Sequence, residues 1–320
     1  MGRRACSDAA PSPIRPEIYH SKDISYRNMH RYLRTIGFSE IRTDEDVDAL
    51  LDGIQASYVD KALLVTMDDG QVRFQICAAV GERLGICIEG YKRDDGILVR
   101  QEYYPFLIST DMSTTVPISV HERVDGKGMS GLADDIRLGI TLIFRLTNSI
   151  AFLKRSKTEK PIDKTIAYLS AFCDDGKVIL PVRKSREGME PVDMGIRHDM
   201  LIEAAKNGNQ RAIEILNNED MNTYAMVTDR LTREDIYSVV DSCFMPQGVE
   251  CDIYQIVGDI VSVEKLENLL TDEFIYDLTV SCNDMIFHVG IGTDDIEGEP
   301  KPGRRFKGRI WMQGRVEYPD

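Results

Sequence analysis

The clearest chemical pattern in this 320-residue chain lies near its C-terminus. Between Gly303 and Arg315, five cations alternate with two aromatic residues. Basic side chains beside stacking aromatics are a common way of holding single-stranded nucleic acid. Strand alternation places Phe306 and Ile310 in the core. It assigns the opposite face to the candidate binding surface, which consists of Arg305, Lys307, Arg309 and Trp311.

The charge around this strand weighs against a nucleic-acid partner. Residues 236–320 contain seven basic and sixteen acidic residues, and the whole chain has a formal charge of −14. Such a charge repels polyanions and weakens non-specific binding to nucleic acid. Nucleic-acid binding through 303–315 is therefore the less favoured interpretation. The alternatives are a strand neutralised by acidic neighbours and a site for a protein or a small anionic partner.

Catalytic motifs do not stand out. The phosphate-binding loop and the dinucleotide-binding fingerprint are both missing from the sequence. The segment Gly128–Gly131 resembles a nucleophile elbow around Ser130, but Leu132 stands where the motif requires glycine. No catalytic residue is predicted, and whether the protein is an enzyme stays open. An enzyme would need a dispersed site, and the residues favoured for it are Tyr103, Tyr104, His121 and Glu122.

Metal sites and cofactors are not predicted either. His121-Glu122 begins like a zinc-protease helix, but the second histidine is missing four residues on. Another combination has spacings that match no closed zinc motif, and its members are Cys243, Cys251, Cys282 and His288. The seven scattered cysteines suit a reducing cytoplasm. No segment reaches the roughly 20 apolar residues of a membrane span, so we expect no membrane association.

The first half of the chain predicts an α+β domain over residues 29–155, with an antiparallel sheet and helices. Acidic residues and apolar spacing predict a helix over 44–58. Asp-Asp-Gly triplets at 68–70, 94–96 and 174–176 separate apolar runs and predict three hairpin turns. The apolar stretch 136–155 predicts one long, buried helix that closes the domain.

The second half divides into two further regions. Residues 156–235 form a predicted connection, with a hairpin, a polar loop at 183–195 and helices within 198–216. Residues 236–320 are rich in short apolar runs and predict a small, closed or half-closed antiparallel β-barrel. The oligonucleotide/oligosaccharide-binding (OB) type is the subtype considered for this barrel. Gly258, inside the longest run, predicts a bulge or bend.

The N-terminal 28 residues lack any hydrophobic periodicity and have no continuous apolar core of a secretory signal. Met29 begins the first structured pattern, MHRYLRTIGFSEI, with Tyr32, Leu33, Ile36 and Phe38. We therefore predict that translation starts at Met29. Residues 1–28 are then a disordered arm or an artefact of the assigned start.

Three segments carry a resemblance to a family: 29–41, 244–260 (FMPQGVECDIYQIVGDI) and 298–314 (GEPKPGRRFKGRIWMQG). Together they resemble uncharacterised proteins of clostridial gut bacteria, over about residues 29–318. The resemblance implies a start equivalent to Met29, and this chain's extension departs from that pattern. Because the family has no assigned activity, the resemblance assigns no role to any residue.

These observations favour a non-catalytic cytoplasmic binding or adaptor protein. Its expected partner is an unknown protein or small molecule, and the sequence does not set the oligomeric state. The alternatives are the enzyme with a dispersed site and the nucleic-acid-binding barrel.

Overall fold

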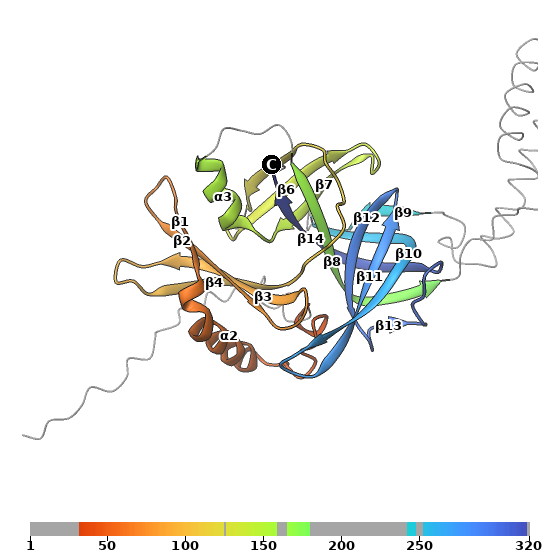
Figure 1. Cartoon of the computed structure of the whole chain (residues 1–320), viewed down its shortest axis with the longest axis horizontal. Helices are drawn as coiled ribbons and strands as arrows, with labels where there is room; N and C mark the ends of the chain where they lie inside the picture. Colours follow the sequence, from red (N-terminus) through yellow and green to blue (C-terminus); the bar gives the residue numbers. More distant parts are fainter. Residues whose placement is uncertain (1–31, 125, 159–164, 180–241, 248–251, 319–320) are drawn as a thin grey trace, which may run out of the picture.

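The computed structural model describes residues 32–124, 126–158, 165–179, 242–247 and 252–318. These residues form an α+β structure dominated by strands, arranged in two sheets (Figure 1). The predicted extension 1–28, the polar loop 183–195 and the helices of 198–216 lie outside the described residues.

Sheet A is an antiparallel meander of four strands: β1 (Leu63–Thr66), β2 (Val72–Ala79), β3 (Leu84–Lys92) and β4 (Leu98–Leu107). The turns at 68–70 and 94–96 join β1 to β2 and β3 to β4, as the Asp-Gly signals predict. Gly70 and Gly96 have φ angles of +86° and +90°, a conformation that glycine adopts without steric cost. Local turn chemistry therefore fixes two of the connections of this sheet.

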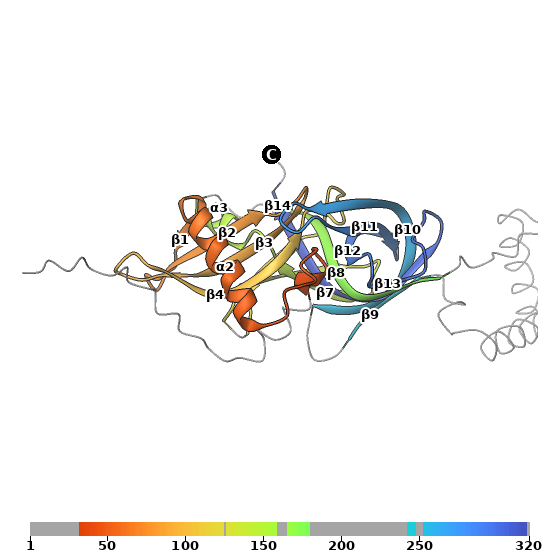
Figure 2. The same cartoon turned by 90° about the horizontal axis from the view of Figure 1, so that it is seen from below.

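Helix α2 (Asp44–Tyr58) covers one face of sheet A (Figure 2) and continues into the short η1 (Val59–Lys61). Thr43 and Asp46 form a reciprocal capping box at its N-terminus. The predicted helix buries one apolar face, on which Val47, Leu51 and Ile54 are buried. A capped, amphipathic segment of this kind specifies its own helix.

The prediction of one long helix over 136–155 is wrong. The stretch forms strand β7 (Ile140–Leu146), followed by the short helix α3 (Ser149–Thr158). β7 pairs with β6 (Met129–Asp135), which pairs in turn with β5 (Ile118–Glu122). A short apolar run does not distinguish a buried strand from a buried helix by periodicity. β7 has pairing partners on both sides, β6 on one and the C-terminal strand β14 (Arg305–Glu317) on the other, and this pairing favours a strand over a helix.

Sheet B contains β5, β6, β7 and seven further strands. These are β8 (Ile166–Ile179), β9 (Cys243–Pro246), β10 (Ile253–Asn268), β11 (Glu273–Cys282), β12 (Met285–Gly292), β13 (Ile296–Glu297) and β14 (Arg305–Glu317). Five of them pair in a ring that returns to its first strand: β8, β12, β11, β10 and β14. The pairing of β8 with β12 is parallel, although only antiparallel pairs were predicted here. Residues 236–320 supply four members of the ring, and β8 comes from the predicted connecting region.

The third predicted hairpin turn, at Asp174–Gly176, is also wrong. The triplet lies inside β8, which pairs with β14 along its length. The register shifts between the pairs Gly308–Gly176 and Ile310–Cys173, so β8 has one extra residue there. Such a β-bulge accommodates the same residue types as a turn while the strand continues.

Gly258 marks the place where β10 changes partner. β10 pairs with β14 up to Gly258 and with β11 from Asp259 onward. The register irregularity follows slightly later, between Ile260 and Ser262. A Cβ added at Gly258 would lie 2.6 Å from the carbonyl oxygen of Ser281, so the close approach of two strands requires glycine.

Candidate functional site

The candidate binding strand is β14, and its alternation is as predicted for the core. Phe306 and Ile310 are fully buried. On the opposite face, Lys307 and Arg309 are half-buried, but Arg305 and Trp311 are each only 2% exposed. The four predicted side chains therefore do not form one exposed surface.

A second layer of structure covers Trp311. Tyr32 stacks on its ring with a centroid separation of 5.0 Å, and Phe172, its register partner on the neighbouring strand β8, lies beside it at 6.5 Å. Its indole Nε1 donates a hydrogen bond to Asp252 Oδ2 at 3.1 Å. The outward face of β14 thus becomes an internal interface at this position, and alternation alone does not reveal such a cover.

The four residues of the dispersed enzyme site are not brought together. Tyr103 and Tyr104 are buried neighbours on β4, and successive strand residues point to opposite faces. His121 is exposed on β5, and Glu122 forms an ion pair with Arg73 at 2.5 Å. Only Tyr104 takes part in the polar network described below.

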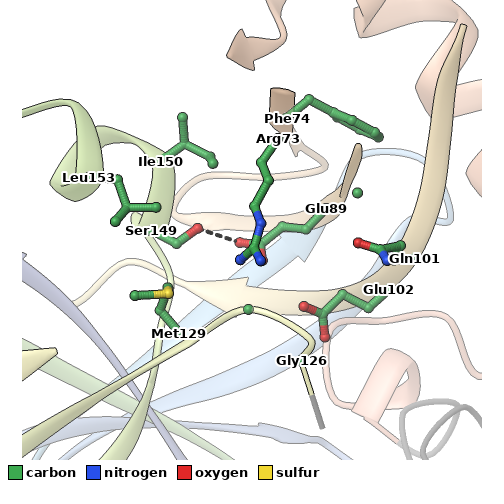
Figure 3. A pocket seen from close by; sticks show the side chains of 12 residues that line it. Arg73, Phe74, Glu89, Gln101, Glu102, Gly126, Met129, Ser149, Ile150 and Leu153 are labelled. Atoms are coloured by element: carbon green, nitrogen blue, oxygen red, sulfur yellow. Dashed lines mark hydrogen bonds between the residues drawn. The ribbon is translucent and has the colours of Figure 1, made fainter. Parts of the chain in front are cut away.

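A small pocket lies between sheet A and the segment from Gly126 to Leu153 (Figure 3). Figure 3 shows Arg73 extending between the apolar Ile150, Leu153 and Met129 on one side and Gln101 and Glu102 on the other. The cavity has a volume of about 20 Å³. It is large enough for about one water molecule, whereas small-molecule sites usually occupy roughly 300–1,000 Å³.

Glu89 is the buried carboxylate at the floor of this pocket. Its Oε1 accepts hydrogen bonds from Gln75 Nε2, the Tyr104 hydroxyl and the Ser149 hydroxyl, each at 2.7 Å. The Ser149 bond is drawn in Figure 3. These donors come from β2, β4 and the start of α3, so the carboxylate ties sheet A to the segment that follows β7.

Arg145, on β7, completes this network. Its Nη2 lies 2.6 Å from Glu102 Oε1 and 3.4 Å from Glu89 Oε2, and its guanidinium stacks 4.3 Å from the Tyr104 ring. Gly128 lies against this guanidinium with φ +71°, and a side chain there would collide with Arg145 and Glu102. We call the following set the Glu89 network: Gln75, Glu89, Glu102, Tyr104, Arg145 and Ser149.

Burial dominates the electrostatics of the Glu89 network. Desolvation raises the pKa of Glu102, although Arg145 opposes the shift. Desolvation also raises the pKa of Tyr104 well above its usual value, so its hydroxyl keeps the proton that it donates to Glu89. For Arg145, desolvation lowers the pKa, but Glu102 and Glu89 outweigh it and the net shift is upward. The guanidinium therefore stays charged.

Two thiols lie beside the network on sheet A. Cys77 of β2 and Cys87 of β3 are opposite each other in register, and their Sγ atoms are 3.0 Å apart. Cys87 is buried and also lies opposite Tyr104 of β4, whereas Cys77 is exposed. Burial raises the pKa of the Cys87 thiol well above its usual value.

A second charged group lies around His288 on β12. His288 Nδ1 is 2.9 Å from both carboxylate oxygens of Asp277, and Nε2 is 2.9 Å from Asp111 Oδ2. Arg83 Nη1 lies 2.8 Å from Asp277 Oδ2. Desolvation lowers the pKa of His288, but the hydrogen bond and charge of Asp277 and the contact with Asp111 raise it overall. We call Arg83, Asp111, Asp277 and His288 the His288 cluster.

No sequence motif predicted the Glu89 network or the His288 cluster. In the His288 cluster His288 meets Asp111 across 177 residues, and the Glu89 network joins Gln75 to Ser149 across 74 residues. In the part of the chain that the structure describes, no three His, Cys, Asp or Glu side chains are grouped to hold a metal ion. Cys251, a member of the predicted zinc alternative, lies outside that part. No helix among the described residues is long and apolar enough to cross a membrane.

Comparison with known proteins confirms the predicted resemblance. The chain belongs to the family described as a domain of unknown function, E. rectale gene description (DUF3881), whose model matches residues 33–314. E. rectale is a clostridial gut bacterium. No curated protein and no solved structure matches the chain. The family therefore supplies membership and no residue role.

Proposed function

We propose that this protein is a non-catalytic cytoplasmic binding protein, and that its binding module is a β-barrel formed by β8, β10, β11, β12 and β14. The observation that carries the proposal is the ring of strand pairings. A sheet whose pairings return to the first strand has no open edge within that ring, as in a barrel.

The order of the ring supports an OB-like barrel in particular. In that fold a three-stranded meander is closed by two further strands, which pair with each other. Here β10, β11 and β12 form the meander, β14 pairs with β10, and β8 pairs in parallel with β12. β14 and β8 pair with each other. The strand that closes the barrel precedes the meander in the chain, so the arrangement is a circular permutation of that order.

The proposed ligand lies on the outer surface of this barrel. The pocket beside Glu89 has room for about one water molecule, so it does not hold a metabolite. Lys307 of β14 lies opposite Lys177 of β8, and Arg309 follows on the same face. Like charges directly opposite on neighbouring strands are unfavourable unless an anion lies near them. Glu297, 3.0 Å from Lys177, supplies one such anion. We propose that an anionic group of a protein or small molecule binds beside Lys177, Lys307 and Arg309 on the same face.

The test is isolation of the full chain from its native lysate, with mass spectrometry of the small molecules and proteins that remain bound. We expect the wild-type chain to retain a stoichiometric anionic ligand. The double variant Lys307→Ala/Arg309→Ala should bind this ligand about tenfold more weakly, a loss of roughly 1.4 kcal/mol of binding free energy. Lys265→Ala on β10 is the matched control and should retain it. A ligand held equally by the double variant would contradict the surface, and chemical turnover of the ligand would contradict the non-catalytic role.

A nucleic-acid ligand is the alternative outcome of the same design. A single-stranded oligonucleotide would bind with an affinity that falls steeply with salt concentration. Salt-insensitive or absent oligonucleotide binding by the wild-type chain leaves the protein or small-molecule ligand.

A further inference from the structure

The cross-strand thiols Cys77 and Cys87 occupy a position where a disulfide fits the backbone. Val80 N donates to Leu84 O at 2.9 Å, which makes Val80–Leu84 a hydrogen-bonded pair of the β2–β3 ladder. Hydrogen-bonded and non-hydrogen-bonded pairs alternate along an antiparallel ladder. Counting back three pairs makes Cys77–Cys87 a non-hydrogen-bonded pair.

Non-hydrogen-bonded pairs bring side chains closest, with Cα atoms about 4.5 Å apart. Disulfides span Cα separations of about 4.4–6.8 Å, so this bond needs little backbone movement. The two sulfur atoms of this pair face each other at 3.0 Å. By contrast, Cys282 Sγ faces the backbone carbonyl oxygen of Cys243, to which it donates at 3.1 Å. The pairing geometry therefore singles out Cys77 and Cys87.

Exposure gives the two thiols different roles. Cys77 is an exposed residue, so we expect a small disulfide to reach its thiol first. Cys87 is fully buried, and its pKa is raised well above the usual value by desolvation, so it is a poor first nucleophile. Its contact with the sulfur of Cys77, at 3.0 Å, places it to act second.

We propose that Cys77 and Cys87 form a redox-active thiol pair, which a low-molecular-weight disulfide oxidises to a cross-strand disulfide. In the first step the Cys77 thiolate attacks one sulfur of the small disulfide. The disulfide bond breaks, a mixed disulfide forms on Cys77, and one small thiol leaves with the proton that Cys77 gave up. In the second step Cys87 attacks Cys77 Sγ and expels the second small thiol, which takes the Cys87 proton. Two protein thiols are oxidised, and one small disulfide is reduced to two thiols.

The cysteine usage of the chain, which predicts a reducing compartment, fits this role. Disulfides in such compartments are usually transient and serve redox sensing. The pair is then a dithiol at rest and becomes a disulfide when the small-thiol pool is oxidised. The site is independent of the proposed barrel surface, because both cysteines belong to sheet A.

The experiment treats the folded full chain with glutathione disulfide, traps free thiols by alkylation, and maps the linked peptides by mass spectrometry. We expect a transient glutathione adduct on Cys77, followed by a peptide pair joined through Cys77 and Cys87 that dithiothreitol separates. Because the linked peptide is observed in the wild-type chain, this arm does not depend on any variant folding.

Two substitutions separate the steps. In Cys87→Ser the adduct on Cys77 should decay at least about tenfold more slowly, because the intramolecular attack is lost. In Cys77→Ser neither the adduct nor the linked peptide should form on β2 or β3. Cys243→Ser is the matched control and should behave as the wild type. Circular dichroism of each variant checks that it is folded.

Several results would overturn the proposal. One is an adduct on Cys77 that persists in the wild type as long as in Cys87→Ser. Another is modification of Cys87 in Cys77→Ser as fast as that of Cys77 in the wild type. A wild-type chain that stays unmodified by glutathione disulfide under these folded conditions would also reject it.

Discussion

The Glu89 network and the His288 cluster both place buried carboxylates beside cations, but in different surroundings. The Glu89 network lies between sheet A and the segments of β7 and α3, and its central side chains Arg145 and Glu89 are 4% and 9% exposed. The His288 cluster joins β11 and β12 to the loop after β4, and the Asp111 side chain there is 48% exposed. The Glu89 network is therefore almost fully buried, whereas the His288 cluster is partly exposed to solvent at Asp111.

The difference shows how the choice of cation follows the surroundings. A guanidinium stays protonated at every pH at which the protein folds, so Arg145 balances Glu89 and Glu102 permanently. An imidazole changes charge near neutral pH, and the balance of the His288 cluster therefore depends on pH. The Glu89 network is expected to hold sheet A against β7 and α3 at every pH. The stabilisation by the His288 cluster is expected to change with pH.

The largest effect is expected from Arg145→Met. This change leaves Glu89 and Glu102 buried without their cation, and should lower the free energy of unfolding by about 3–5 kcal/mol. Urea denaturation at neutral pH measures it. The matched control is Lys301→Met, whose ion pair with Glu299 is exposed on both sides and should contribute at most about 1 kcal/mol. Equal losses of unfolding free energy in the two variants would show that the Glu89 network does not hold sheet A against β7 and α3.

A smaller, pH-dependent effect is expected from His288→Gln. The folded pKa of His288 is raised, so its charged form stabilises the folded state. This stabilisation is complete below the unfolded value of about 6.5 and is lost as pH rises through the folded pKa. The variant should therefore lose about 1–3 kcal/mol at acidic pH and less at alkaline pH.

Urea denaturation at a series of pH values tests this sign. His121→Gln, at an exposed site on β5, is the matched control and should change the free energy of unfolding by less than about 0.5 kcal/mol. A loss in His288→Gln that grows with pH would contradict the raised pKa of His288 between Asp111 and Asp277.

The smallest effect is expected from Asp111→Asn. Because this carboxylate is half exposed, its loss should cost within about 1 kcal/mol, while the pKa of His288 moves downward. Proton NMR of the imidazole and urea denaturation measure the two quantities. A cost equal to that of His288→Gln would mean that Asp111, rather than the buried Asp277, holds the imidazole.

The sequence alone determined the features that neighbouring residues encode. Thr43 and Asp46 lie three positions apart and cap α2, and the Asp-Gly turns at 68–70 and 94–96 join adjacent strands. The alternation of β14 placed Phe306 and Ile310 in the core. Family membership also followed from the segments of the chain itself.

Tertiary structure decided the rest, because partners distant in the chain compete with local preference. The same Asp-Asp-Gly triplet that turns the chain at 68–70 becomes a bulge at 174–176, where β14 offers a continuous pairing edge. Residue type gave no hint that Tyr32 covers Trp311, or that Arg145 meets Glu89 across 56 residues. Turns and caps need only adjacent residues, whereas cover, ring closure and charge pairing exist only after separate segments meet.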